Sequence, residues 1–360
     1  MAQIDGFFKL MNDEGASDLH MVAGQQPLLR VRGDMERVKF KSLGNDELRA
    51  MLYEICPEEK IKVFEETGDI DFGYEIPGLA RYRCNFFQQK YGVGAVFREI
   101  PSDILTVDQL GLPKVISRLA HLPKGLVLVT GPTGSGKSTT LAAIVDECNK
   151  TRKDHILTIE DPIEFVHKSQ KCIVNHREVG THTRSFSAAL RGALREDPDI
   201  ILVGEMRDLE TISLAMEAAM TGHLVFGTLH TINAMKTVDR IIEIFPANQQ
   251  GQVRSTLADA LKAVVSQTLF KRVDVKGRCA ALEILIATPA VRNLIRDAKT
   301  YQILSTMQTG KKYGMQTLDD AIEIYLEKKM ISSDDAYSNA VEKARFLPYL
   351  RNAPSDFTEV

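Results

Sequence analysis

Apolar residues between positions 113 and 229 come in short, nearly unbroken runs that alternate with helical patterns. The runs predict strands buried on both faces, and they cover residues 126–130, 155–159, 200–203 and 224–229. Between them, apolar side chains recur three and four positions apart, as in amphipathic helices, over residues 139–149, 186–195 and 209–220. Strands that alternate with helices predict an α/β fold with a parallel sheet covered by helices on each side.

The first hundred residues follow another pattern. Alternating apolar and polar positions predict strands at residues 69–76, 79–88 and 92–100, and helical spacing predicts helices at 45–55 and 58–64. Because strands and helices do not alternate here, we expect a small α+β domain. The sequence thus predicts a domain at residues 1–100, a linker at 101–112 and a second domain at 113–360.

The last third of the chain reads as mostly helical. The predicted helices cover residues 249–271, 289–309 and 318–329, and the final dozen residues, with two prolines among polar side chains, are expected to be loose.

Composition narrows the classes of function. The chain has 360 residues and a net charge of −3, which gives no long-range attraction to nucleic acid or to anionic lipid. Its five cysteines form no C-x-x-C pair, so the sequence supports neither a zinc cluster nor a redox motif. Residues 1–5 lack the basic and apolar pattern of a signal peptide, and no apolar run is long enough to span a bilayer. We therefore expect a cytoplasmic protein that reaches a membrane through partners.

The segment Gly131–Ser138 carries the most specific chemistry. It matches the phosphate-loop pattern G-x-x-x-x-G-K-[ST] between a predicted strand and a predicted helix. Its glycines let the backbone approach phosphate oxygens, and the N–H groups at the helix start face the anion. Lys137 is expected to reach the β- and γ-phosphates of ATP, and Ser138 to hold Mg²⁺. The predicted nucleotide-binding residues are Thr133, Gly134, Ser135, Gly136, Lys137, Ser138 and Thr139.

Carboxylates follow two of the predicted buried strands. Glu160, Asp161 and Glu164 come at the end of the strand at 155–159, where one of them could orient an attacking water or bind the water shell of a metal. Taken alone, they could also form a solvated acidic turn, and the neighbouring phosphate loop favours the functional interpretation. Glu205 follows the strand at 200–203, and Gly204 stands where such strands usually carry aspartate. Glu205 is therefore the second predicted metal residue, which reaches Mg²⁺ directly or through water.

Other polar residues near these strands have more than one interpretation. Arg207 and Asp208 read as a surface ion pair. His223 and His230 are seven residues apart and flank one strand, so they should point to opposite faces and not share a metal. His230, at the carboxyl end, is better placed to sense the γ-phosphate, whereas His223 could be a core or interface histidine.

Two arginines of the first domain are also candidates. Alternation places Arg81 and Arg83 on one face of a strand. Phosphoryl transfer often uses an arginine from a neighbouring subunit, and these side chains could supply it. A solvated strand edge is the alternative.

Four of these segments resemble the Walker A, Asp box, Walker B and His box of the type II/IV secretion ATPases. The segments are 131–138, 159–165, 199–205 and 221–230. Within that family the chain is similar to the retraction motors of bacterial type IV pili, because residues 288–297 resemble their AIRNLIRE motif with Val291 and Asp297 as conservative departures. Extension ATPases usually carry an extra N-terminal domain and a four-cysteine zinc motif, which this sequence does not show.

The resemblance implies a PAS-like N-terminal domain and a RecA-like ATPase domain with a helical C-terminal part, assembled as a hexameric ring. It implies that Glu164 is the catalytic glutamate, Glu205 the Walker B acid and His230 the nucleotide-sensing histidine, and that Arg81 and Arg83 approach the nucleotide across a boundary. Expected cofactors are ATP and Mg²⁺. Expected partners are an inner-membrane platform protein of the pilus and a second retraction ATPase. An accessory retraction ATPase, a RecA-like nucleic-acid motor and a nucleotide-gated regulator remain alternatives.

Overall fold

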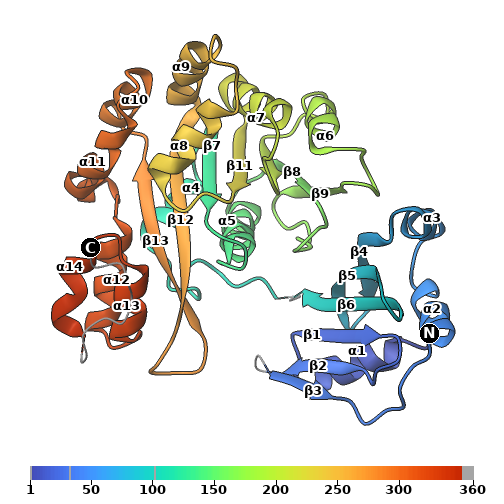
Figure 1. The fold of residues 1–360 in the computed structure, drawn as a ribbon. Helices are drawn as coiled ribbons and strands as arrows, with labels where there is room; N and C mark the ends of the chain where they lie inside the picture. Colours follow the sequence, from blue (N-terminus) through green and yellow to red (C-terminus); the bar gives the residue numbers. More distant parts are fainter. Residues whose placement is uncertain (1, 32–33, 101–102, 351–360) are drawn as a thin grey trace. The chain divides into compact units, whose positions relative to one another are not determined.

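The computed structural model describes residues 2–31, 34–100 and 103–350, in two compact units (Figure 1). One unit comprises the chain up to Asp103 together with Pro162–Val166, and the other comprises Ile104–Asp161 and the chain from His167 onward. The predicted linker begins with residues 101–102, which lie outside the described residues, as do residues 351–360 of the predicted loose end. None of the helices in the described ranges combines the length and apolar character that crossing a bilayer requires.

The first unit contains a six-stranded antiparallel sheet with the order β3-β2-β1-β6-β5-β4. Its strands are β1 Asp18–Val22, β2 Leu28–Val31, β3 Asp34–Arg37, β4 Asp69–Ile76, β5 Ala80–Gln89 and β6 Gly92–Ile100. Its helices are α1 Asp5–Asp13, α2 Asn45–Tyr53 and α3 Glu58–Thr67. In the core, Phe8 stacks on Tyr82 at 4.2 Å and meets Phe97 edge-on at 5.0 Å. The three strands predicted between 69 and 100 are confirmed.

The second unit is built on a seven-stranded sheet with the order β13-β12-β7-β11-β10-β8-β9. All neighbours pair in parallel except β12 and β13. The strands are β7 Gly125–Thr130, β8 His155–Glu160, β9 Ile173–Glu178, β10 Ile200–Val203, β11 Leu224–Leu229, β12 Leu261–Lys271 and β13 Arg278–Ile286. The expected α/β fold with a helical C-terminal part is confirmed.

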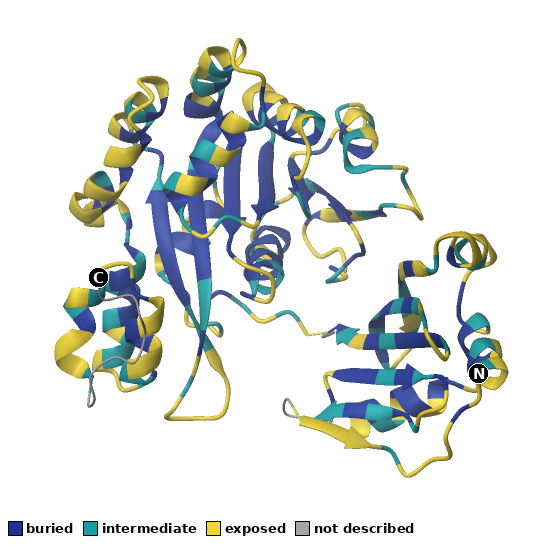
Figure 2. Ribbon diagram, in the orientation of Figure 1, coloured by how far each residue is buried: buried dark blue, intermediate teal, exposed yellow. Residues whose placement is uncertain are grey.

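Helices cover both faces of this sheet and bury its strands (Figure 2). One face packs against α6 Phe186–Ala193, α7 Leu209–Thr221, α8 Ala234–Glu243, α9 Gln250–Ala260 and α10 Pro289–Arg296. The other face packs against α4 Lys114–Leu119 and α5 Lys137–Thr151. Because apolar side chains meet helices on both faces, the strands have the nearly unbroken apolar runs seen in the sequence.

The helix predicted at 249–271 is wrong in its second half. The helix α9 ends at Ala260, and Leu261–Lys271 is strand β12. Strand β12 lies between β7 and β13, where the run Ala263-Val264-Val265 pairs with both neighbours. The run's spacing suits a helix or a buried strand equally, and pairing with β7 decides for the strand. Strand β13, in a segment without a predicted element, completes the edge of the sheet.

The chain ends in short helices beside this edge. They are α11 Ile303–Thr309, α12 Leu318–Glu327, α13 Ser333–Asn339 and α14 Lys343–Phe346, with single 3₁₀ turns at Thr300–Gln302, Lys311–Tyr313 and Leu347–Tyr349. Phe346 is buried in a small core that also contains Phe270 of β12 and Ala281 of β13. The helical end therefore packs on the β12–β13 hairpin.

Candidate nucleotide site

The phosphate loop connects the end of β7 to the start of α5. Gly131 has a φ of 140°, and a Cβ there would lie 2.4 Å from the carbonyl oxygen of Gln267. Only glycine fits this position, because the backbone conformation and the close approach both exclude a side chain. Thr133 and Gly134 form the exposed tip of the loop, and Ser138 lies half-buried in the first turn of α5.

Lys137 is folded back over the loop. Its Nζ atom donates hydrogen bonds to the carbonyl oxygens of Gly131 at 2.9 Å and Pro132 at 3.0 Å, and the residue is only 9% exposed. The ammonium group is thereby held at the loop that the sequence assigns to phosphates. Charged phosphate oxygens are stronger acceptors for an ammonium than neutral carbonyls. The observed geometry suits a lysine that transfers from backbone oxygens to a bound triphosphate.

A residue missed by the sequence analysis supports the loop from β12. The side-chain amide of Gln267 donates to the carbonyl oxygen of Ser135 at 2.7 Å and accepts from the Thr140 hydroxyl at 2.7 Å. Gln267 therefore joins the loop to the first turn of α5, where Thr139 and Gly136 are half-buried. The helix predicted over this segment hid the contact, because the contact depends on the pairing of strand β12 with β7.

Glu205, His230 and Arg207 form one ionic group at the ends of β10 and β11. His230 Nε2 lies 2.9 Å from Glu205 Oε1, and Arg207 Nε forms an ion pair with the same oxygen. Burial raises the pKa of the Glu205 carboxyl, but the hydrogen bonds and charges of Arg207 and His230 outweigh burial and hold the pKa below its ordinary value. The carboxylate is thus kept ionised beside the phosphate loop.

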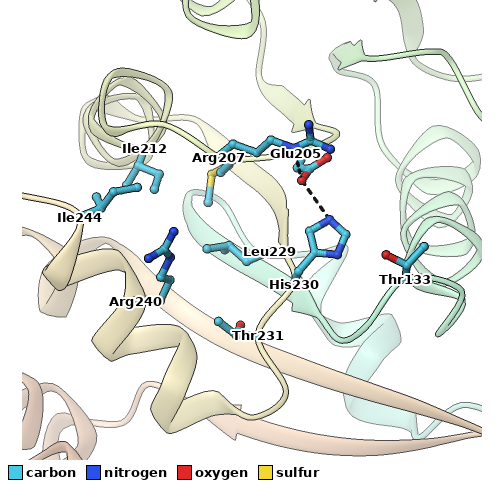
Figure 3. A pocket seen from close by; sticks show the side chains of 10 residues that line it. Thr133, Glu205, Arg207, Ile212, Leu229, His230, Thr231, Arg240 and Ile244 are labelled. Atoms are coloured by element: carbon cyan, nitrogen blue, oxygen red, sulfur yellow. Dashed lines mark ion pairs between the residues drawn. The ribbon is translucent and has the colours of Figure 1, made fainter. Parts of the chain in front are cut away.

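These residues line a cavity of about 600 Å³ (Figure 3). Thr133 of the phosphate loop, Glu205 and His230 border one part of it, and Arg207 and Arg240 bring positive charge to its wall. The rest of the lining comes from Met206, Ile212, Leu229, Thr231 and Ile244. The structure therefore brings predicted residues from three segments to one hollow, at the carboxyl edge of the parallel strands where α/β sheets bind ligands.

Gly204 explains why this strand end carries a single carboxylate. A Cβ at Gly204 would lie 3.1 Å from the carbonyl oxygen of Ile159 and 3.2 Å from the Cα atom of Glu160. The close approach of β8 leaves little room for the aspartate usually found at that position. The expected surface ion pair between Arg207 and Asp208 is wrong, since Arg207 pairs with Glu205 and Asp208 accepts from Thr211 N at 2.8 Å as the N-cap of α7.

The three carboxylates after β8 have different surroundings. Glu160 is buried, with Oε1 3.9 Å from His176 Nδ1. Asp161 is exposed, and Glu164 is half-buried in the segment Pro162–Val166 that groups with the first unit. The structure does not place Glu164 relative to the phosphate loop, so its catalytic role stays a prediction.

Arg81 and Arg83 lie on β5 of the first unit and pair within it. Arg81 Nη1 is 3.5 Å from Glu75 Oε2, and Arg83 Nε is 3.5 Å from Asp71 Oδ1. Both partners belong to the neighbouring strand β4, so each arginine makes a cross-strand ion pair within this unit. Their approach to a nucleotide stays a prediction.

His223 has local partners. Its Nδ1 lies 2.9 Å from the carbonyl oxygen of Ala218, at the end of α7. Across the described ranges, no group of three or more His, Cys, Asp or Glu side chains is placed to hold a metal ion. Ser138 and Glu205 supply oxygen donors of the kind that Mg²⁺ binds, and their role as metal residues stays a prediction.

Comparison with known proteins gives a consistent match. Residues 80–293 match the family model described as type II/IV secretion system protein. The chain is 56% identical over 332 residues to the type IV pilus retraction ATPase PilT of Pseudomonas aeruginosa. The alignment covers 92% of this chain and 95% of the relative. It is 39% identical over 338 residues to the type IV pilus ATPase PilU of the same species, covering 94% and 88%.

A solved structure is also similar over nearly the whole chain. It is the crystal structure of the pilus retraction motor PilT with bound ADP, with a TM-score of 0.88 and 44% identity, covering 96% of this chain and 98% of that one.

Proposed function

The chain belongs to the type II/IV secretion system protein family, and from that premise we propose that it is an ATP-hydrolysing motor that retracts type IV pili. The observation that carries the proposal is the cavity where the phosphate loop, Glu205 and His230 meet. The similarity to a retraction motor that binds ADP supports a nucleotide at this place. ATP is then the substrate, and the expected pilus role follows from the 56% identity to PilT.

Each residue at the cavity and the phosphate loop has a separate role toward the bound triphosphate. Lys137 leaves the carbonyl oxygens of Gly131 and Pro132 and neutralises phosphate charge. The Ser138 hydroxyl and the Glu205 carboxylate are hard oxygen donors of the kind Mg²⁺ prefers, and they would hold it together with phosphates and water. When bound, Mg²⁺ neutralises charge on the phosphates. His230, already hydrogen-bonded to Glu205, responds to the presence or absence of the γ-phosphate.

Glu164 and the two arginines supply the remaining chemistry in this proposal. The Glu164 carboxylate orients the attacking water. Arg81 or Arg83 exchanges its carboxylate partner on β4 for phosphate oxygens and stabilises charge in the transition state. Loss of the γ-phosphate weakens these contacts, and the two predicted domains reorient through the segment 101–112.

We also propose a homohexameric ring as the working form, because trans-acting arginines require a neighbouring subunit. The ring acts on the cytoplasmic side of the inner membrane through the platform protein of the pilus, and it shares the work with an accessory ATPase. The lower identity to PilU, 39% against 56% to PilT, favours the main retraction role over the accessory one. The same identities favour a pilus motor over a nucleic-acid motor or a nucleotide-gated regulator.

The test is pilus retraction in a piliated strain that lacks its own retraction ATPase but keeps the accessory one. We expect the wild-type chain to restore retraction, and Glu164→Ala at equal abundance to restore none. The purified variant should still bind ATP while its turnover falls by about two orders of magnitude, the typical cost of losing a positioned acid–base group. Normal turnover in Glu164→Ala would contradict its role, and a wild-type chain that hydrolyses ATP without restoring retraction would contradict the pilus function.

A further inference from the structure

Three buried polar side chains form a row across the sheet beside the phosphate loop. Ser266 of β12 is the register partner of Thr130 at the end of β7 and of Glu283 on β13. Directly paired residues present their side chains on the same face of a sheet. The three residues are 0%, 2% and 5% exposed for Thr130, Ser266 and Glu283. The hydroxyls of Thr130 and Ser266 lie 2.8 Å apart.

The helix α8 is hydrogen-bonded to this row through its first turn. The N–H group of Ala234, the first residue of α8, donates to Glu283 Oε1 at 2.7 Å. The Thr237 hydroxyl lies 3.5 Å from that of Thr130 and donates to the carbonyl oxygen of Asn233 at 2.7 Å. The Thr231 hydroxyl lies 2.7 Å from that of Thr237.

Such an arrangement constrains α8 more tightly than apolar packing alone. Farther along, α8 packs on apolar residues of the same face, including Leu128 and Val264. Apolar contact tolerates small sliding, whereas a buried hydrogen bond that is broken leaves an unsatisfied polar group. The carboxylate of Glu283 at the helix start is also favoured by the helix dipole. The first turn of α8 is therefore held at one position over β7, β12 and β13.

The helix α8 in turn fixes the segment that precedes it, which contains His230. Only Thr231, Ile232 and Asn233 separate His230 from the first residue of α8. Thr231 bonds Thr237, and Asn233 caps the helix by accepting from Lys236 N at 2.8 Å. His230 is thus tied by a few residues to a helix whose first turn is hydrogen-bonded to Glu283, in the same row as Thr130, the residue before Gly131 of the phosphate loop.

We propose that Glu283 and Thr237 are positioning residues for His230: Glu283 fixes the first turn of α8 on the Thr130–Ser266–Glu283 row, Thr237 ties that turn to Thr231, and together they set the place of the imidazole relative to the phosphate loop. This inference rests on the proposed role of the site in ATP hydrolysis. Neither side chain is among the described residues that line the 600 Å³ cavity, so both act through the segment they anchor.

The first experiment compares substitutions that keep or remove each hydrogen-bonding group. Thr237→Val removes the hydroxyl at nearly constant volume, and Thr237→Ser restores it. Glu283→Leu removes the acceptor of the Ala234 N–H, and Glu283→Gln keeps an oxygen there. Thr256→Val on α9 is the matched control, because the Thr256 hydroxyl also donates to the carbonyl oxygen four residues earlier, at 3.1 Å.

We expect kcat for ATP to fall about tenfold in Thr237→Val and Glu283→Leu, the cost of one buried polar contact, while KM changes less than about twofold. Thr237→Ser and Glu283→Gln should recover turnover, and Thr256→Val should leave it unchanged. Loss of ATP binding with unchanged kcat would overturn the inference, because it would place the effect on the phosphate loop.

The decisive experiment combines Thr237→Val with His230→Ala. If Thr237 acts through His230, the double variant should turn over ATP within about twofold of His230→Ala alone. Fully additive losses would overturn the inference. Thr231→Val breaks the same hydroxyl contact at a half-buried loop position, and its cycle with His230→Ala provides the same comparison if Thr237→Val does not fold. A wild-type chain that hydrolyses no ATP would instead overturn the proposed function and this inference with it.

Discussion

Glu205 and Glu283 are glutamates in two regions of the same sheet, and their surroundings shift their pKa values in opposite directions. Glu205 lies just past the end of β10, lines the cavity and pairs with Arg207 and His230. Glu283 lies within β13 under α8 and accepts a backbone N–H. Burial is the largest effect on both pKa values, but hydrogen bonds and charge from Arg207 and His230 reverse it at Glu205, so the pKa of Glu205 is lowered and that of Glu283 is raised.

The comparison distinguishes Glu205, a carboxylate placed to take part in the chemistry, from Glu283, a carboxylate that holds a helix in position. An ionised carboxylate paired with exposed side chains can exchange partners when a nucleotide arrives. A buried carboxylate bonded to the start of a helix has a fixed partner, and Asp319 raises its pKa further by like charge. We therefore expect charge to matter at Glu205 and hydrogen-bonding geometry to matter at Glu283.

The largest expected effect comes from replacing each carboxylate by its amide. Glu205→Gln removes the charge at the cavity and should lower ATP turnover by about a hundredfold, the size of losing one preorganised electrostatic group. Glu283→Gln keeps an acceptor for Ala234 and should stay within about threefold of wild type. Steady-state phosphate release measures both. Similar losses in the two variants would break the comparison.

A second carboxylate should not fit at the cavity edge. Gly204→Asp would press its Cβ toward the Ile159 carbonyl oxygen, and we expect unfolding to become easier by about 1–3 kcal/mol, as for other overpacked sites. Gly251→Ala is the control, since no described atom lies within 4 Å of a Cβ at that position in α9. Urea denaturation measures the stability of both variants. A Gly204→Asp variant as stable as wild type would contradict the claim that β8 leaves little room for a side chain at this position.

The smallest expected effect is an opposite pH dependence of stability. Because folding raises the pKa of Glu283, the folded state binds more protons above the ordinary glutamate pKa, and this carboxyl costs stability as pH rises. Folding lowers the pKa of Glu205, so its contribution is present above the ordinary value and is lost as pH falls.

The measurement is the free energy of unfolding between pH 3 and pH 8 for the two amide variants. Relative to wild type, Glu283→Gln should become more stable as pH rises, and Glu205→Gln less stable. Parallel curves for the two variants would contradict the opposite pKa shifts.

Local sequence pattern predicted much of this molecule. The strand–loop–helix around Lys137 is readable because apolar runs, glycine spacing and helical period all fall within a short window. The same holds for the strands that end near Glu205 and His230, which the structure brings to one cavity. The catalytic roles of Glu164, Arg81 and Arg83 stay predictions, as does the domain boundary at residues 101–112.

Contacts between distant segments could not be predicted from such windows. Gln267 meets the phosphate loop because β12 pairs with β7 more than a hundred residues earlier in the chain, and Glu283 meets α8 because β13 pairs with β12. The ionic group of Glu205 and Arg207 likewise depends on how the chain leaves β10, where Asp208 caps α7. These features follow from tertiary pairing, which spacing along the chain does not contain.

The most direct test of the account is equilibrium binding of a fluorescent ATP analogue, with Mg²⁺, to the wild-type chain and to Lys137→Ala. Lys137 already lies over the loop, bonded to Gly131 and Pro132, so its removal should leave the fold intact and take away the main cation for the phosphates. We predict saturable binding to wild type and at least about a hundredfold weaker binding to the variant, the loss expected for a charge-assisted contact. Equal affinity of the two proteins would contradict the assignment of this loop as the nucleotide site.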